Sequence, residues 1–251
     1  MAAQRSVCLS CHPVHHGDCG NCTGCHRGND RSERKNIAHA GLIGGYYAHF
    51  TIPGSPIVAE GKKLIDAAGC RRCHRTGGKG NGLASDLDRF FLEASPKEIA
   101  SAIKEPVLYM PHFRFTDGQL TALVNAVAEG SRQEAEPRGE TVRVVHFADK
   151  NLENSFVKRC GSCHKLLSEA YGGLGSGRIG PNLSGIFSEF YPVTFSGKER
   201  WNEVNLKRWL KNPRMVRPNA LMPPVPVSAA EFRQLLDALV VSRRGKGPLR
   251  K

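Results

Sequence analysis

The stretch Cys160-Gly-Ser-Cys163-His164 is one of four pentapeptides in which two cysteines, three residues apart, are followed at once by a histidine. The other three are Cys8-Leu-Ser-Cys11-His12, Cys22-Thr-Gly-Cys25-His26 and Cys70-Arg-Arg-Cys73-His74. Together they use eight of the nine cysteines in the 251 residues. Histidine makes up only 10 of those residues, so a histidine after all four pairs is not a chance arrangement.

The pentapeptide has the spacing of c-type haem attachment. Two thiols three residues apart share one face of a helical turn, so both can form thioethers with the two vinyl groups of one haem. The adjacent histidine then reaches the iron as its proximal ligand. Zinc ribbons and disulfides are the competing interpretations, but neither requires a histidine after each pair. The sequence therefore predicts four covalently bound haem c groups, bonded through Cys8, Cys11, Cys22, Cys25, Cys70, Cys73, Cys160 and Cys163, with His12, His26, His74 and His164 on the iron.

The composition agrees with small modules built around a cofactor. Hydrophobic residues make up 40% and aromatic residues 7%, with Gly 27 and Pro 15, which predicts loop-rich modules that need a staple. Cys19 is left over and is expected to be a free thiol rather than part of an intermolecular bridge. No apolar stretch approaches the length of a membrane-spanning helix. No secretory segment precedes Cys8, so the chain is expected to be a mature form whose export signal lies outside it, located in the periplasm or on the outer face of the cytoplasmic membrane.

The formal net charge of +13 limits the kinds of binding partner that the chain is expected to have. It is the charge either of a solvated basic surface or of a surface that steers the protein toward an acidic redox partner, a membrane-complex subunit or an anionic membrane. Lysine and arginine are scattered rather than interleaved with aromatic residues, so nucleic-acid binding is not predicted.

From residue 56 the chain repeats one order of parts: helix, haem motif, long loop, helix, Met-Pro, helix. In the first copy the last two helices are predicted from the capping boxes Ser95-Pro96-Lys97-Glu98 and Thr116 with Gln119. The apolar period of the first and last helices is carried by Gly61, Leu64, Ile65 and Ala68, and by Leu120, Leu123, Val124 and Val127.

The second copy follows the same order. Phe156 and Val157 lead into Cys160, a helix with Leu206, Trp209 and Leu210 ends before Pro213, and Met222-Pro223 comes next. The last helix opens with the capping box Ser228-Ala-Ala-Glu231 and carries Phe232, Leu235, Leu236, Leu239 and Val240. Neither copy has strand alternation, and a polar linker is predicted at about residues 130–139.

Each copy resembles a class I monohaem cytochrome c domain, in which the N-terminal helix carries the motif, a C-terminal helix packs across it and a late methionine is the sixth iron ligand. The resemblance implies that Met110 pairs with His74 and Met222 with His164; His112 and Met215 are the alternatives. In Gly180-Pro181-Asn182-Leu183 the family's proline carbonyl would hold the ring of His164. The first copy has Gly80-Asn81-Gly82-Leu83 there, without the proline.

The N-terminal residues resemble the compact bis-histidine modules of multihaem cytochromes, because two motifs start only 14 residues apart. The segment has no methionine after Met1, so its sixth ligands are expected to be His15 and His39, with His16 and His49 as alternatives. The predicted fold is thus mainly α: a loop-rich dihaem segment at residues 1–55 and two tandem small helical domains similar to cytochrome c, at 56–135 and 136–251.

Axial ligands tune haem iron, and methionine with histidine gives a higher potential than two histidines. We therefore expect an electron-transfer protein, with no catalytic residues, that passes electrons from a low-potential pair to two higher-potential haems. It would serve as a carrier or as a subunit of a membrane-associated quinol-oxidising or extracellular complex. The alternative is a haem enzyme that reduces a small oxyanion or a peroxide at an iron with a labile sixth ligand.

Overall fold

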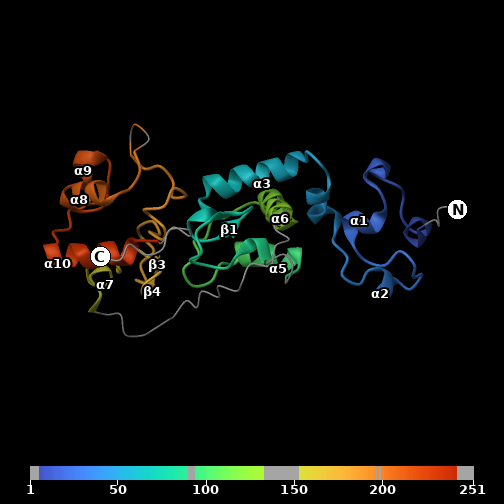
Figure 1. The fold of residues 1–251 in the computed structure, drawn as a ribbon, viewed down its shortest axis with the longest axis horizontal. Helices are drawn as coiled ribbons and strands as arrows, with labels where there is room; N and C mark the ends of the chain where they lie inside the picture. The colour runs from blue at the N-terminus through green and yellow to red at the C-terminus, as the bar shows by residue number, and fades with distance from the viewer. Residues whose placement is uncertain (1–5, 90–93, 133–152, 196, 198, 242–251) are drawn as a thin grey trace.

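The computed structural model describes residues 6–89, 94–132, 153–195, 197 and 199–241. Three groups of elements follow one another along the long axis of the molecule (Figure 1). The described parts of the N-terminal segment (residues 1–55) lie at one end, those of copy one (56–135) in the middle and those of copy two (136–251) at the other end. The predicted helices occur in each copy in the predicted order, although the structure adds short β-ladders and, in copy two, the helix α9; helix is the main regular structure of the described residues.

The N-terminal segment consists of short helical turns joined by loops. They are the 3-10 turns Val7–Ser10, Gly17–Cys19, Gly45–Tyr47 and His49–Thr51, and the helices α1 (Cys22–His26) and α2 (Lys35–Ala38). Asn21 caps α1 by accepting a hydrogen bond from the Gly24 N–H at 2.8 Å. The buried apolar residues that the structure describes here start at Ile43, and Ile43 and Phe50 pack on Val58 of copy one.

Copy one is built on two long crossing helices, α3 (Pro56–Ala67) and α6 (Asp117–Arg132). The turn Cys70–Arg72 follows α3, and α5 (Pro96–Lys104) packs on α6. α3 and α6 approach closely because Gly61 has no side chain: a Cβ there would overlap the Ala122 carbonyl oxygen and come within 2.7 Å of the Ala126 Cβ. The capping boxes expected at Ser95 and Thr116 are both confirmed.

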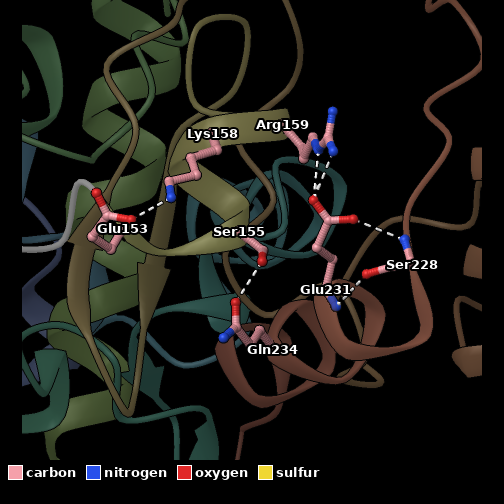
Figure 2. A network of polar contacts seen from close by, with 7 residues as sticks. All are labelled: Glu153, Ser155, Lys158, Arg159, Ser228, Glu231 and Gln234. Carbon is pink, nitrogen blue, oxygen red and sulfur yellow. Dashed lines mark hydrogen bonds and ion pairs between the residues drawn. The ribbon is translucent and has the colours of Figure 1, made fainter.

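Copy two has a shorter first helix, α7 (Ser155–Arg159), which packs on α10 (Ala229–Leu239). Polar side chains join the two, as Figure 2 shows: Ser155 Oγ donates to Gln234 Oε1, and Arg159 pairs with Glu231 at 2.8 Å. α8 (Glu203–Lys211) and α9 (Pro213–Val216) lie between them in sequence. The core is formed by Phe156, Leu166, Leu174, Ile186, Leu206, Leu210, Phe232 and Leu235.

Short β-ladders were not expected, and each copy has one. β1 (Arg75–Thr76) pairs antiparallel with β2 (Lys79–Gly80), and β3 (Leu166–Ser168) pairs antiparallel with β4 (Gly172–Leu174). The first turn is Gly77-Gly78, with φ of 60° and 72°. Two glycines with positive φ suit a tight hairpin, which explains why pairing forms without strand alternation.

Two expected boundaries also differ from the structure. The linker was predicted from about residue 130, but α6 continues to Arg132 and Gly130 is buried against Gly77, where only a glycine leaves room. The rest of the predicted linker, residues 133–139, lies outside the described residues. At the C-terminus, Val240 caps α10 instead of continuing its apolar stripe, and its side chain is exposed. Among the described residues, none of the helices is long and apolar enough to span a bilayer.

Candidate haem-binding sites

Each motif is folded as a single helical turn. The histidine N–H donates to the carbonyl oxygen of the motif's first cysteine at 3.0 Å in His12, 3.0 Å in His74 and 2.8 Å in His164. The second motif, Cys22–His26, is the helix α1 itself. One closed turn brings both cysteines and the histidine of a motif together on one side of the chain, which is the arrangement that attachment to one haem requires.

In the two copies the motif cysteines are withdrawn from solvent: Cys160 is buried, and Cys70, Cys73 and Cys163 are half-buried. Burial raises the pKa of Cys70 to about 11 and that of Cys160 to about 11, and it also raises the pKa of Cys73. Burial disfavours a thiolate because the charge would lose its hydration. A thioether carries no ionisable proton, so these positions suit a sulfur that is bonded to carbon.

Three of the four motif histidines are oriented by a backbone carbonyl. Nδ1 of His164 lies 2.8 Å from the Pro181 oxygen, and Nδ1 of His74 lies 2.9 Å from the Ser85 oxygen. Nδ1 of His26 lies 3.0 Å from the Ile43 oxygen. Because a carbonyl oxygen only accepts, Nδ1 must carry the proton, and the lone pair is left on Nε2 for a metal. A hydrogen bond from Nδ1 to a carbonyl is also what commonly orients a histidine that binds a metal through Nε2.

The Pro181 contact is the one that the resemblance implies. For His74 the sequence offered no proline, and the structure uses the Ser85 carbonyl instead. Desolvation lowers the pKa of His74, while the bond to Ser85 opposes that shift. A lowered pKa keeps the imidazole neutral, and neutral imidazole is the form that binds a metal. The carbonyls of Ser85 and Ile43 were missed because a backbone oxygen has no residue-type signature.

In the N-terminal segment, two histidine pairs face one another. Nε2 of His15 lies 3.4 Å from Nε2 of His26, with ring centroids 5.6 Å apart. The rings of His12 and His39 have centroids 6.1 Å apart. An iron between two imidazoles needs the nitrogens roughly 4 Å apart, twice a metal–imidazole bond of about 2 Å. The first pair would have to open by roughly half an ångström to take the metal.

The alternative histidines are placed differently. His16 packs edge-on against the ring of His15, with centroids 5.6 Å apart, and its backbone φ of 46° is left-handed. His49 begins the turn His49–Thr51, next to the packing of Phe50 on copy one. The structure thus brings His15 and His39, the two expected ligands, close to motif histidines. The side chain of Cys19 lies outside what the structure describes.

The two expected methionine ligands lie in the loops before the last helix of each copy. Met222 packs partly buried against the core of copy two, and Trp209 Nε1–H donates to its sulfur at 3.0 Å. Its alternative, Met215, is 82% exposed. Met110 is half-buried between α5 and α6, whereas its alternative His112 is exposed. The pairing of Met110 with His74 and of Met222 with His164 stays a prediction.

Residues 56–125 match the family model described as cytochrome C oxidase, cbb3-type, subunit III. The matched part runs from α3 through the third motif and Met110 into α6. This match supports a c-type cytochrome, which implies covalently bound haem c and electron transfer with redox partners. Neither the curated proteins nor the solved structures include a match to the chain.

Proposed function

We propose that this chain is a tetrahaem c-type cytochrome that carries electrons between respiratory redox partners. The observation that carries the proposal is the fixed orientation of His26, His74 and His164 by carbonyls on Nδ1, with Nε2 left for iron. In the first, third and fourth motifs the histidine N–H bonds the carbonyl of the first cysteine, and the family match covers the third motif. Haem, when bound, supplies an iron that takes up and releases one electron.

The side chains divide the four sites into two types. His39 would complete the site of His12, and His15 the site of His26, as the facing pairs support. Met110 would complete the site of His74 and Met222 that of His164. Methionine raises the potential relative to a second histidine, so the N-terminal pair is low in potential and the other two sites are higher.

The order of the three groups along the long axis supports a linear electron-transfer pathway. Electrons would enter at the N-terminal segment, pass copy one and leave from copy two (Figure 1). The charge of +13 would steer the protein toward an acidic redox partner or a subunit of a membrane-associated quinol-oxidising or extracellular complex. An exported location, in the periplasm or on the outer face of the cytoplasmic membrane, belongs to the same proposal.

A near-infrared magnetic circular dichroism spectrum of the oxidised protein tests the proposal, because it counts haems by ligand pair. We expect two bis-histidine haems and two histidine–methionine haems, and a potentiometric titration with two groups of potentials. His15→Met should convert one bis-histidine signal into a histidine–methionine signal, whereas the control His16→Ala should leave the count unchanged. Four haems with one potential and one ligand pair would contradict the proposal, and strong carbon monoxide binding would favour the enzyme alternative.

A further inference from the structure

Arg72 stands between the two cysteines of the third motif, yet haem attachment gives it no role, because the other three motifs have serine or glycine at that position. Its side chain is buried, with the residue only 8% exposed. A buried charge is costly unless it is hydrogen-bonded or paired. The partners of Arg72 therefore indicate what the residue does.

Those partners belong to copy two. Arg72 Nη1 donates to the Asn182 carbonyl oxygen at 3.0 Å, although the two residues are 110 positions apart. The guanidinium carbon lies 5.4 Å from the ring centroid of the buried Tyr191, a cation–π contact, and the Tyr191 hydroxyl donates to the same Asn182 oxygen at 3.2 Å. The backbone carbonyl of Arg72, in contrast, bonds within copy one, where it accepts a hydrogen bond from Asn81 Nδ2 at 2.9 Å.

The far end of this contact lies next to the proximal ligand of the fourth motif. Asn182 follows Pro181, whose carbonyl oxygen orients His164. A chain of covalent and hydrogen bonds thus runs from the third motif through Arg72 and Asn182 to His164.

The other side of the third site reaches copy two as well. Tyr109 precedes Met110, and its carbonyl oxygen accepts a hydrogen bond from Asn182 Nδ2 at 2.7 Å. Its ring packs so closely on Gly173 of β4 that a Cβ there would overlap it. Lys165, next to His164, donates to the Leu108 carbonyl at 2.9 Å and lies 5.7 Å from the Tyr109 ring centroid. Both chain segments that would flank the third haem are therefore fastened to the loop that orients His164.

We propose that this contact is the junction across which the sites of His74 and His164 exchange electrons, and that Arg72 is the positioning residue that keeps it closed. The inference rests on the proposed function. Electron tunnelling falls steeply with separation, so the two sites exchange electrons efficiently only while the copies are docked. Relative motion of small domains is the default unless their interface is large and hydrophobic, so the loss of one buried, charged contact should loosen the junction.

The test uses the full chain and its variant Arg72→Gln. In half-reduced protein, the rate of intramolecular electron exchange is measured from the exchange broadening of the two haem-bound methionine methyl resonances, extrapolated to low protein concentration. Loss of a charge-assisted hydrogen bond should shift the equilibrium between docked and separated copies by about tenfold to a hundredfold. We expect the exchange rate to fall by the same factor. Small-angle scattering should show a larger maximum dimension.

Arg71→Gln is the matched control. Arg71 lies in the same motif and carries the same charge, but its side chain bonds Thr76 and Asp66 inside copy one. It should leave the exchange rate unchanged. Gly173→Thr opens the junction from copy two by displacing the Tyr109 ring, and it should slow exchange as Arg72→Gln does, so the test survives a variant that fails to fold.

The haem count and the ligand spectrum of each variant separate the two proposals. If the unmodified protein lacks covalent haem at the third or fourth motif, the proposed function and the junction fail together. If four haems and both methionine-ligated signals are present and Arg72→Gln exchanges electrons as fast as Arg71→Gln, the junction alone is wrong.

Discussion

Copy one and copy two share their order of elements, but their first and last helices meet in different ways. α3 and α6 touch backbone to backbone at Gly61, with Leu123 and Ala126 closing the core beside it. At the edge of this crossing, Lys62 pairs with Glu129 at 3.0 Å. α7 and α10 are joined by more side-chain links, through Ser155 to Gln234 and Arg159 to Glu231 (Figure 2). The first and last helices thus meet by close backbone contact in copy one, and mainly through polar side chains in copy two.

The difference has an energetic consequence. A close-packed crossing is sensitive to every added atom, because the neighbouring backbone can relax only a little. A polar crossing depends on hydrogen bonds that each contribute about 1 kcal/mol, and one of its groups is titratable. The copies should therefore respond to different perturbations. Because the chain holds several domains, segment-resolved hydrogen exchange is the appropriate measurement rather than one unfolding midpoint.

The largest effect is expected for Gly61→Ala in copy one. The new Cβ would overlap the Ala122 carbonyl oxygen, so α3 and α6 must separate, at a cost of about 3 kcal/mol in the free energy of opening. Hydrogen exchange should accelerate in α3 and α6 but not in α10. Gly118→Ala in α6 is the control: an added Cβ there meets nothing within 4 Å, so stability should stay the same or rise by up to about 1 kcal/mol. Equal effects of the two variants would refute the close crossing.

An intermediate effect is expected for Trp209→Phe in copy two. The variant removes the indole N–H that donates to the Met222 sulfur, which should weaken this methionine as a ligand by about 1 kcal/mol, or roughly fivefold in its displacement by added imidazole. Both tryptophans of the chain lie in copy two, so only one of the two proposed methionine-ligated sites should change.

Trp201→Phe is the matched control for this change, because its N–H donates to Thr194 Oγ1 at 3.0 Å instead of to the methionine. An imidazole titration monitored in the near infrared separates the two. If both variants shift the midpoint equally, or neither does, the bond to Met222 has no role in tuning that site.

The smallest effect is the acid sensitivity of the polar crossing. Bonds from the Ser228 N–H and from Arg159 hold the pKa of Glu231 below its ordinary value of 4.5. A lowered pKa means that the folded state prefers the carboxylate, so this stabilisation is complete above pH 4.5 and is lost as the pH falls through the folded value. After correction for the slower intrinsic amide exchange in acid, hydrogen exchange in α7 should therefore accelerate on acidification below pH 4.5.

Glu231→Gln should abolish that acceleration, since glutamine can still cap the helix but binds no proton. Glu98→Gln is the control. The pKa of Glu98 is also lowered, by its capping bonds to Ser95, but Glu98 begins α5 and does not join the crossing helices. If it changed the acid response of α7 as much as Glu231→Gln, the contrast between the copies would be lost.

Local signals explain what the sequence could predict. The capping boxes at Ser95, Thr116 and Ser228 fix helix starts through residues only three apart, and all three are present in the structure. The Gly77-Gly78 turn is a local signal too. Two successive glycines favour positive φ and hence a tight hairpin, so this pair could have predicted the first ladder. The approach of His15 to His26 follows the same principle, since only 11 residues separate them.

Tertiary contacts explain what the sequence could not predict. The Ser85 carbonyl that orients His74 is a backbone atom, and every residue type offers one. The role of Arg72 depends on Asn182, which is 110 positions away in the other copy. The motif sequence therefore could not predict that role. In the sequence, Gly61 is only a glycine on the apolar face of a predicted helix. The residue type does not indicate which segment packs against it, so the close crossing with α6 could not be predicted.

The central claim is that four porphyrins are bonded to this chain through sulfur, and the mass of the intact, matured protein tests it most directly. The account predicts a denatured, fully reduced mass that exceeds the polypeptide by four haem groups, with peptides carrying one haem on each of the four motifs. A mature protein whose mass equals that of the polypeptide alone, or whose colour is lost on denaturation and extraction, would contradict it.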